Sequence, residues 1–556
     1  MKCVSKGTLK RILAAQFSQL GAEELLRLSR GLEDLSTLTQ GHWRWASACS
    51  GSDVVYLALE ALHGLWKSRM GSVPEIGHAF SCEDVKFKQE WIKTFFAPDH
   101  IFPDIHFLKG DSVQDIDGND VSDLSCDAFI AGVECDSISA LNRDRSQNFD
   151  CAIEEASGQP TRTGDTARSA MGFLEKRRPP LAIFENVKQL ACAGKSGQSN
   201  LDWLISRASQ LGYHVVHMAL SALSFGVPQQ RDRMYIICVF VGGTPHQSKL
   251  GHDESTPVEA EPGWVHDLRA FIHSMNIPSL DLHEFLLPDS DPEVASANAA
   301  LCQPAPAKKL KRKRVGALPE DGGDLEAGGK GATANVMKFE VEHLEFYSQA
   351  KVAWPPALPE AFVAKASCLP RRMQEILFLE ERLFGPAESL KTLRCRDLNM
   401  TMGWGKWRES GVPCVVSSAA LWLRGPRLGG TIDRLLCGKE LLQLQGFDAH
   451  RQESPHVFAH KDKVDLAGNA FCAPILLAVV SAVVACVDWQ VAWRAKDHAA
   501  RPAVASPEPQ PASPAPQESL DGDSLYGEEE GGESEEPEVD LEVETDSGAS
   551  VGSMLG

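Results

Sequence analysis

The sequence lacks the features that would assign it at once to a disulfide-rich, zinc-binding or membrane class. None of its fifteen cysteines belongs to a Cys-x-x-Cys pair, so neither a disulfide framework nor a metal site is predicted. The N-terminus carries no signal-type apolar core. The longest apolar run, 473–487, has fifteen residues and includes Pro474 and Ser481, whereas a membrane helix needs about 20. We therefore expect a soluble intracellular protein with buried thiols, a core helix at 473–487 and no membrane partner.

Basic residues are scarce as well, but the deficit is local. The chain has 55 Lys and Arg against 76 Asp and Glu, a formal net charge of −21. Residues 501–556 hold fifteen of these acids and one arginine, so they contribute −14 and the rest of the chain only −7. The acidic total thus does not exclude phosphate binding by a local basic patch.

The patterning of the first half predicts a sheet flanked by helices. Residues 1–40 have helical periodicity and form a predicted N-terminal extension. Between 41 and 245, short apolar runs alternate with helical segments, which predicts the α/β class and a parallel, doubly wound sheet. The expected strands are 43–48, 77–82, 104–109, 126–131, 180–184, 213–220 and 234–241.

The second half is less regular. Residues 246–335 are rich in Pro, Gly, Asp and Ser and contain the basic run KKLKRKR at 308–314, so a partly disordered linker or insertion is expected. Order is predicted to resume at 336–430, and 431–497 returns to compact helical patterning. Residues 498–556 are acidic and of low complexity, which predicts a disordered tail.

Loops that follow the first three expected strands have the composition of a nucleotide site. In doubly wound sheets the ligand lies beyond the carboxyl ends of the strands. The turn Ser50-Gly51-Ser52 lets the backbone approach a ligand at the start of a helix. Glu83 is placed to accept hydrogen bonds from a ribose diol, and Asp111 to contact an adenine amino group. Each also fits a plainer alternative, namely an ordinary turn or a solvated carboxylate.

Three later loops carry reactive or charged side chains. Cys135 follows the fourth strand, although a free cysteine is more often simply buried. Glu185 and Asn186 end an apolar strand, where a carboxylate is costly unless it has a partner or a function. The segment PQQRDR (228–233) is either a turn with surface charges or an extended stretch that projects three side chains to one side, those of Gln229, Arg231 and Arg233.

Taken in order, these segments resemble the motifs of the cytosine carbon-5 DNA methyltransferases: SACSGSD, CED, GDS, GVECDSIS, FENV and PQQRDR. The resemblance continues in LLCGKELLQLQGF (435–447) and DLAGNAFCAPI (465–475). It implies a Rossmann-like S-adenosylmethionine-dependent methyltransferase sheet, built from 41–245 and 431–497. Residues 336–430 would then be an inserted, smaller target-recognition domain.

The resemblance also implies roles for individual residues. The family transfers a methyl group from S-adenosylmethionine to carbon 5 of cytosine, through a covalent cysteine adduct with a base flipped out of duplex DNA. By resemblance, Cys135 attacks carbon 6, Glu185 holds ring nitrogen N3 and Arg233 contacts the flipped base. Arg231 and Asn186 would belong to the same catalytic set. Gln229 would bind the substrate, and with Arg231 it would support the loop. The implied cofactor-binding residues are Ser50, Gly51, Ser52, Glu83, Asp111 and Asn469.

Two positions depart from the family pattern. The usual Pro-Cys-Gln of the nucleophile loop is Glu134-Cys135-Asp136, and two carboxylates beside the thiol should raise its pKa and reduce the thiolate fraction. The usual Phe-x-Gly-x-Gly turn is CSGSD at 49–53. Two alternatives therefore stay open. One is an RNA cytosine-5 methyltransferase, although the Cys-Phe-Thr tripeptide of transfer-RNA relatives is absent. The other is a catalytically weak nucleic-acid-binding or adaptor protein.

Candidate DNA contacts lie in MTMGWGKWRESG (400–411), where Trp404, Lys406 and Arg408 combine aromatic and basic character. A core position is the alternative for the tryptophan. Arg424 and Arg427 are further candidates. The basic run at 308–314 predicts nuclear import or a phosphate contact, and otherwise a solvated linker in a cytoplasmic protein. The acidic tail is a candidate for binding basic or chromatin partners.

Overall fold

The computed structural model describes residues 7–71, 73–141, 162–194, 197–242, 262–301, 338–353, 358–360, 362, 369–403, 405–427, 429–448, 452 and 458–500. All of them fall in one compact unit, Met1–Pro502. The basic run at 308–314, Trp404 and the acidic residues 501–556 lie outside the described residues.

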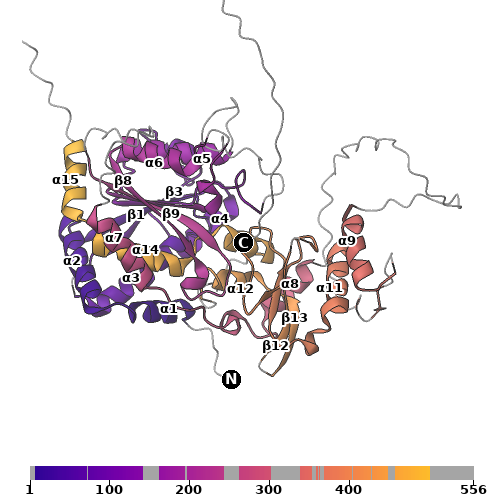
Figure 1. Ribbon diagram of the computed structural model, residues 1–556. Coiled ribbons are helices and arrows are strands. Elements are labelled where there is room, and N and C mark those ends of the chain that lie inside the picture. Colours follow the sequence, from indigo (N-terminus) through magenta and orange to yellow (C-terminus); the bar gives the residue numbers. More distant parts are fainter. Residues whose placement is uncertain are drawn as a thin grey trace, which may run out of the picture. The chain divides into compact units, whose positions relative to one another are not determined.

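A seven-stranded sheet forms the centre of the larger domain (Figure 1), with the strand order β3-β2-β1-β6-β7-β9-β8. Its strands are β1 (His42–Ala48), β2 (Glu75–Cys82), β3 (His100–Phe102), β6 (Ala128–Ala131), β7 (Leu181–Val187), β8 (Tyr213–Ser221) and β9 (Asp232–Phe240). From β3 to β7 the neighbours pair in parallel, whereas β9 is antiparallel to both β7 and β8. The predicted α/β class is confirmed, with one reversed strand that the prediction of a parallel sheet did not include.

Helices cover both faces of this sheet (Figure 1). Successive side chains of a strand point to opposite faces, and β6 shows this directly. Phe129 packs against Phe173 of helix α5, with ring centroids 4.4 Å apart, whereas Ile130 belongs to the apolar cluster on the other face. The first face is covered by α5 (Arg162–Arg177) and α6 (Asn200–Gln210), and the second by α1 (Thr8–Phe17), α2 (Ala22–Leu38), α3 (Val54–Arg69), α7 (Gly263–Ser274) and α14 (Ala473–Cys486).

Helix α14 is the core helix predicted for the longest apolar run. Its residues from Ala473 to Val484 are buried, and it packs on α2, α3 and α7. Pro474 lies in its first turn, where a missing N–H does not interrupt the helix. The helical stretch His460–Cys486 is long and apolar enough to cross a membrane, but 83% of its most apolar window is buried inside the protein.

A second, smaller domain has its own sheet and apolar core. The sheet has the order β11-β10-β12-β13 and is antiparallel throughout. Helices α9 and α11 pack with it around residues such as Leu379, Trp422 and Leu435. These elements are β10 (Arg394–Asp397), β11 (Arg408–Glu409), β12 (Leu421–Arg427), β13 (Gly430–Leu435), α9 (Lys338–Gln349) and α11 (Arg371–Phe384).

The described residues also contain further helices and one more sheet. The helices are α4 (Lys86–Phe95), α8 (Pro292–Leu301), α12 (Gly438–Gln443), α13 (His460–Asn469) and α15 (Trp489–Ala500), and a two-stranded sheet is formed by β4 (Val113–Gln114) and β5 (Asp120–Val121). The short 3-10 helices are η1 (Ile105–Phe107), η3 (Lys188–Ala191), η4 (Ala222–Ser224), η5 (Leu282–Phe285) and η6 (Ala387–Ser389).

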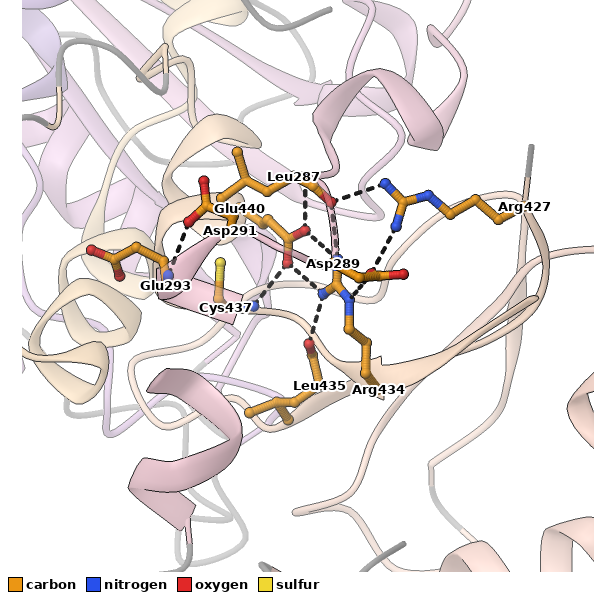
Figure 2. Close-up of polar contacts among 9 residues, drawn as sticks. All are labelled: Leu287, Asp289, Asp291, Glu293, Arg427, Arg434, Leu435, Cys437 and Glu440. Carbon is orange, nitrogen blue, oxygen red and sulfur yellow. Dashed lines mark hydrogen bonds and ion pairs between the residues drawn. The ribbon is translucent and has the colours of Figure 1, made fainter. Parts of the chain in front are cut away.

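An ion-pair network fastens the small sheet to the larger domain (Figure 2). Glu440 of α12 is fully buried and accepts two hydrogen bonds from Arg434 of β13, at 2.8 and 3.0 Å. It also accepts from the backbone N–H of Leu287 at 2.9 Å. Asp289 accepts from both Arg434 and Arg427, each at 2.8 Å. The network therefore joins α12, the small sheet and the segment before α8.

Three predicted boundaries differ in the structure. The third strand ends at Phe102, and 104–109 instead contains η1, because the Asp104 side chain accepts from the N–H of His106 and starts a helical turn. The predicted linker at 246–335 contains α7 and α8, and apolar side chains of α7 are buried against α14. The small sheet continues to Leu435, five residues beyond the predicted end of the recognition region at 430.

Candidate active site

The carboxyl ends of β1, β2, β6 and β7 meet where the strand order reverses, the usual ligand position in such sheets. A cavity of about 210 Å³ opens there. Its wall includes Gly51, Glu83, Cys135, Glu185 and Asn469. A second hollow of about 460 Å³ shares Cys135 and Asn469 and extends to the small domain. The structure thus brings predicted catalytic and cofactor residues to one edge of the sheet.

Cys135 lies in the loop after β6, where its carbonyl accepts a hydrogen bond from the N–H of Ser139 at 2.9 Å. Burial raises the pKa of the Cys135 thiol to about 12. The Arg233 guanidinium opposes this rise in pKa, whereas Glu185 and the two flanking carboxylates add to it. The flanking carboxylates act in the predicted direction, but burial is the larger cause.

The reversal of β9 places Arg233 beside Glu185. Because β9 runs opposite to β7, it begins at the edge where β7 ends, and Arg233 pairs in register with Val187. Arg233 Nε lies 3.1 Å from Glu185 Oε1, and its Nη2 donates to Cys414 Sγ at 3.5 Å. The ion pair orients the Glu185 carboxylate at the mouth of the cavity.

Arg231 and Asn186 connect the loops around these side chains. Asn186 Nδ2 donates to the carbonyl of Val133 at 3.1 Å, which ties the end of β7 to the loop that carries the cysteine. Arg231 is buried and lies 3.7 Å from Glu185. Its guanidinium donates to three backbone carbonyls, those of Val415, Gly468 and Ala470. Both side chains therefore join the loops that surround the cavity.

The turn after β1 has an unusual backbone. Cys49, Gly51 and Asp53 have φ angles of 50°, 66° and 54°, the left-handed region that favours glycine. A Cβ on Gly51 would lie 3.0 Å from Asn469, so the two segments touch closely here. The N–H of Gly51 donates to Glu83 Oε2 at 3.2 Å. Burial raises the pKa of Glu83 to about 7, against the effect of Lys88.

A buried polar cluster holds this turn in place through hydrogen bonds and an ion pair to Asp53. Ser50 Oγ donates to Asp53 Oδ1 at 3.2 Å, and Ser81 Oγ donates to Asp53 Oδ2 at 2.5 Å. His78 Nε2 lies 3.2 Å from the same carboxylate. Burial would raise the pKa of Asp53, but His78 and these hydrogen bonds hold it below its usual value. Asp53, which stands where the family pattern has its second glycine, therefore takes part in a local network with Ser50, Ser81 and His78.

Three predicted cofactor residues, Ser50, Ser52 and Asp111, lie outside the cavity wall. Ser50 is buried in the polar cluster with Asp53. Ser52 is buried beneath the turn, where its carbonyl accepts from Trp91 Nε1 at 3.1 Å. Asp111 is fully exposed and pairs with Lys176, so its predicted adenine contact is not supported. The reason is the boundary of β3: the strand ends at Phe102, and the wall after it is formed by the loop at 104–106.

The second hollow contains some of the predicted substrate residues. Lys406 and Arg408 are exposed on its wall, whereas Trp404 is not among the described residues. Gln229 is fully buried next to Val412 and lies outside both walls, and its neighbour Gln230 lines the hollow instead. Sequence alternation alone did not show which of the two glutamines faces the site.

The other charged or aromatic candidates of the recognition region are held in ion pairs or in the core of the small domain. Arg424 is buried and paired with Glu381 and Asp433. Arg427 pairs with Asp289 and donates to the carbonyl of Leu287. Trp407 is partly buried against the core of the small domain. Their side chains therefore stabilise the small domain and its attachment.

The structure also adds residues that the motifs did not indicate. Lys88, His106 and Cys414 line the two hollows. Lys88 lies five residues beyond Glu83. The apolar residues around it repeat with a helical period, and this pattern was the sequence signal that one face of the helix is buried. Nothing in the sequence pointed to Cys414. Within the described ranges, no three His, Cys, Asp or Glu side chains are grouped so that they could hold a metal ion.

Comparisons with known proteins agree with the motif order. Residues 79–269 match the family model of C-5 cytosine-specific DNA methylase, a range that includes Cys135, Glu185 and Arg233. The DNA (cytosine-5-)-methyltransferase DMT5 of Cryptococcus neoformans is 27% identical over 268 residues, which are 46% of this chain and 10% of that protein. Type II methyltransferase M.HaeII of Haemophilus aegyptius is 28% identical over 183 residues, which are 33% of this chain and 50% of that enzyme.

The chain therefore spans between a tenth and a half of the length of these two relatives. Among solved structures, the S. pombe Dnmt2 methyltransferase aligns with 79% of this chain and 97% of its own, at a TM-score of 0.38 and 10% identity. The family match and the curated relatives confirm the resemblance that the ordered motifs indicated. Residues 79–269 of this chain are therefore similar to the C-5 cytosine-specific DNA methylases.

Proposed function

We propose that this protein is an S-adenosylmethionine-dependent DNA (cytosine-5-)-methyltransferase. One observation carries the proposal: the thiol of Cys135 and the Glu185–Arg233 ion pair share a cavity with the close-approach turn at Gly51. A nucleophile for cytosine and a cradle for a cofactor therefore adjoin each other. The family match over 79–269 supports the same chemistry.

The residues on the cofactor side fit S-adenosylmethionine. Glu83 is a buried carboxylate at the end of β2, where a ribose diol finds an acceptor. Gly51 and Asn469 both line the cavity, and the missing side chain of Gly51 lets Asn469 approach the turn closely. Carboxylates outnumber cations in this wall, which suits a positively charged sulfonium. When bound, S-adenosylmethionine supplies the methyl group.

The catalytic side chains act on the cytosine ring. Cys135 loses its proton and its thiolate forms a bond to carbon 6, which makes carbon 5 nucleophilic enough to take the methyl group. Glu185 holds the ring at N3 while charge develops there, and Arg233 lies close enough to stabilise the thiolate. Loss of the carbon-5 proton then breaks the bond to carbon 6 and releases the thiolate.

DNA is the proposed substrate. The second hollow reaches from Cys135 to Lys406 and Arg408, which is where a flipped base and its flanking phosphates would lie. The names of both relatives describe methyltransferases, and one of them names DNA.

We also propose that the basic run at 308–314 directs the protein to the nucleus and that the acidic tail binds basic or chromatin partners. A fusion of residues 302–337 to a fluorescent protein tests the first of these proposals.

A methyl-transfer assay separates the alternatives. The full chain is incubated with labelled S-adenosylmethionine and either duplex DNA or RNA, and the assay is repeated with Cys135→Ser. Label in DNA that disappears with Cys135→Ser is the expected result. Label in RNA alone would identify an RNA methyltransferase.

A second candidate function, a slow or inactive DNA-binding protein, is favoured by the raised pKa of Cys135, about 12. A duplex that contains 5-fluorocytosine distinguishes it, because an active thiolate forms an adduct that cannot eliminate. Peptide mapping is expected to place this adduct on Cys135. DNA binding without an adduct after long incubation at alkaline pH would support the inactive alternative.

A further inference from the structure

The cofactor side of the cavity contains a buried lysine. Lys88 lies in the first turn of α4, with only 8% of its surface exposed. Because an ammonium group is strongly hydrated in water, a lysine is seldom buried unless its charge is paired. Lys88 Nζ lies 3.2 Å from Asp465 Oδ1 and 3.8 Å from Glu83 Oε1. One ammonium group therefore faces carboxylates from two segments that are far apart in the sequence.

Each carboxylate leads on to a residue of the cofactor wall. Glu83 Oε2 accepts from the N–H of Gly51 at 3.2 Å, and Asp465 Oδ1 accepts from Asn469 Nδ2 at 2.8 Å. Gly51 and Asn469 adjoin each other, because a Cβ added to Gly51 would lie 3.0 Å from Asn469. The five residues form a closed ring beside the cavity, which we call the Lys88 ring: Gly51, Glu83, Lys88, Asp465 and Asn469.

We propose that Lys88 is a positioning residue for the cofactor, which holds Glu83 ready to accept hydrogen bonds from a ribose diol. This inference rests on the proposed function, because it names the residue that prepares the cofactor site of that function. Lys88 is not one of the motif residues, and the structure alone shows its two partners.

The charges around Glu83 explain why a cation is needed there. Asp84 adjoins Glu83, and Asp104 lies in the same wall. The other two positively charged side chains among the described wall residues, those of Arg231 and Arg233, lie against Glu185 instead. Burial and then Asp84 raise the pKa of Glu83, and Lys88 opposes both.

Removal of the ammonium group should therefore change the pKa of Glu83 in a known direction, and the consequence for cofactor binding can be measured. Without Lys88, the pKa of Glu83 moves further above its present value of about 7, so the carboxyl group is protonated at neutral pH. A protonated carboxyl group has lost one acceptor for the diol. Higher pH restores the carboxylate. A residue that only supported the fold would weaken binding equally at every pH.

The test is calorimetric titration of the full chain with S-adenosylmethionine, without DNA. Lys88→Met is compared with Lys88→Arg and with Lys93→Met as a matched control, because Lys93 lies on the same helix and is half exposed beside Asp117. We expect Lys88→Met to weaken binding about tenfold or more near pH 7 and to recover most of it near pH 9. Lys88→Arg and Lys93→Met should stay within about threefold of the wild type.

A loss that is equal at all pH values, or no loss, would overturn the proposal. If Lys88→Met does not fold, Glu83→Gln is compared with the Glu83→Gln/Lys88→Met double variant, which lacks both buried charges. Equal affinities are expected, because Lys88 acts through Glu83, and a further large loss would overturn this role. A wild type that binds the cofactor but methylates no DNA refutes the proposed function alone. A wild type that does not bind it refutes both.

Discussion

At the scale of single residues, the site contains groups whose ordinary acidity is changed by burial. The cysteine that should attack cytosine is a poor acid in the free protein, and the glutamate that should bind a diol holds its proton up to about neutral pH. Burial is the first cause in both cases, and neighbouring carboxylates add to it. The expected pH dependence of the proposed methyl transfer and of cofactor binding follows from these two groups.

The rate of methyl transfer should rise with pH. Because the pKa of Cys135 is raised to about 12, the thiolate fraction at lower pH grows about tenfold for each pH unit. The single-turnover rate at saturating cofactor and DNA, measured between about pH 7 and about pH 9, is expected to follow this slope. A rate that is flat over this range would mean that DNA binding or another step lowers the pKa first.

Removal of one flanking carboxylate should increase the rate. Asp136 raises the pKa of Cys135, so Asp136→Asn is expected to raise the single-turnover rate near pH 7 by about two- to fivefold. Asp120→Asn, at an exposed position in β5, is the control and should leave the rate unchanged. A single-turnover rate for Asp136→Asn below that of the wild type would show that this carboxylate promotes methyl transfer.

The buried carboxylate of Glu83 should lower the free energy of unfolding at neutral and higher pH. Its pKa in the folded protein, about 7, lies above the ordinary value of 4.5, so between these values the folded state binds more protons than the unfolded chain. The free energy of unfolding therefore falls as pH rises through this window. Asp465 still pairs with Lys88 in Glu83→Gln, which is expected to be more stable than the wild type above about pH 7 by on the order of 2 kcal/mol. Urea unfolding at several pH values measures the difference, which should vanish below about pH 4.

At the scale of elements, α13 holds the two sides of the site together. Its Gly468 packs against the backbone of Val416 and Ser417, and a Cβ there would lie 2.1 Å from the Ser417 N. The Gly468 carbonyl also accepts from Arg231. The end of α13 therefore sets where the cofactor wall lies relative to the loop before β12.

Gly468→Ala should destabilise the protein and disturb the site together. The added methyl group meets backbone atoms that cannot rotate away, so we expect a loss of about 1–3 kcal/mol in unfolding free energy and weaker cofactor binding. Gly64→Ala is the control, because Gly64 lies in the middle of α3 and no atom is within 4 Å of the place that the new methyl group would take. This control should be neutral or stabilising. Wild-type stability for Gly468→Ala would contradict the close approach.

At the scale of the whole molecule, the small domain is attached by apolar side chains of its sheet, such as Leu421, Leu423 and Ile432, and by buried polar contacts. The Glu440–Arg434 ion pair is the most deeply buried of these (Figure 2), and it reaches both the segment before α8 and the end of the small sheet. A buried ion pair contributes little compared with an apolar contact, but its disruption leaves an unpaired charge. The attachment of the small domain therefore depends on both partners.

Glu440→Gln should lower the stability of the protein by about 3–5 kcal/mol, because Arg434 keeps its charge in a buried place. Asp289→Asn removes an acid that pairs with the same arginine but is more than half exposed, and it is expected to cost less than about 1 kcal/mol. Urea unfolding compares the two. Equal losses of unfolding free energy would show that the exposed Asp289 contributes as much to the network as the buried Glu440.

The amino-acid sequence by itself determined the α/β class, most strand positions and the loop that carries each main residue predicted to be catalytic. It could do so because apolar runs and polar loops are local patterns, and because Cys135, Glu185 and Arg233 follow these runs in a characteristic order. Only the tertiary structure decided the reversal of β9, the burial of Gln229, the absence of Asp111 from the cavity and the pairing of Lys88 with Asp465. These depend on which segments pack together across hundreds of residues, and such contacts are set by the balance of burial, charge and strand register rather than by any local pattern.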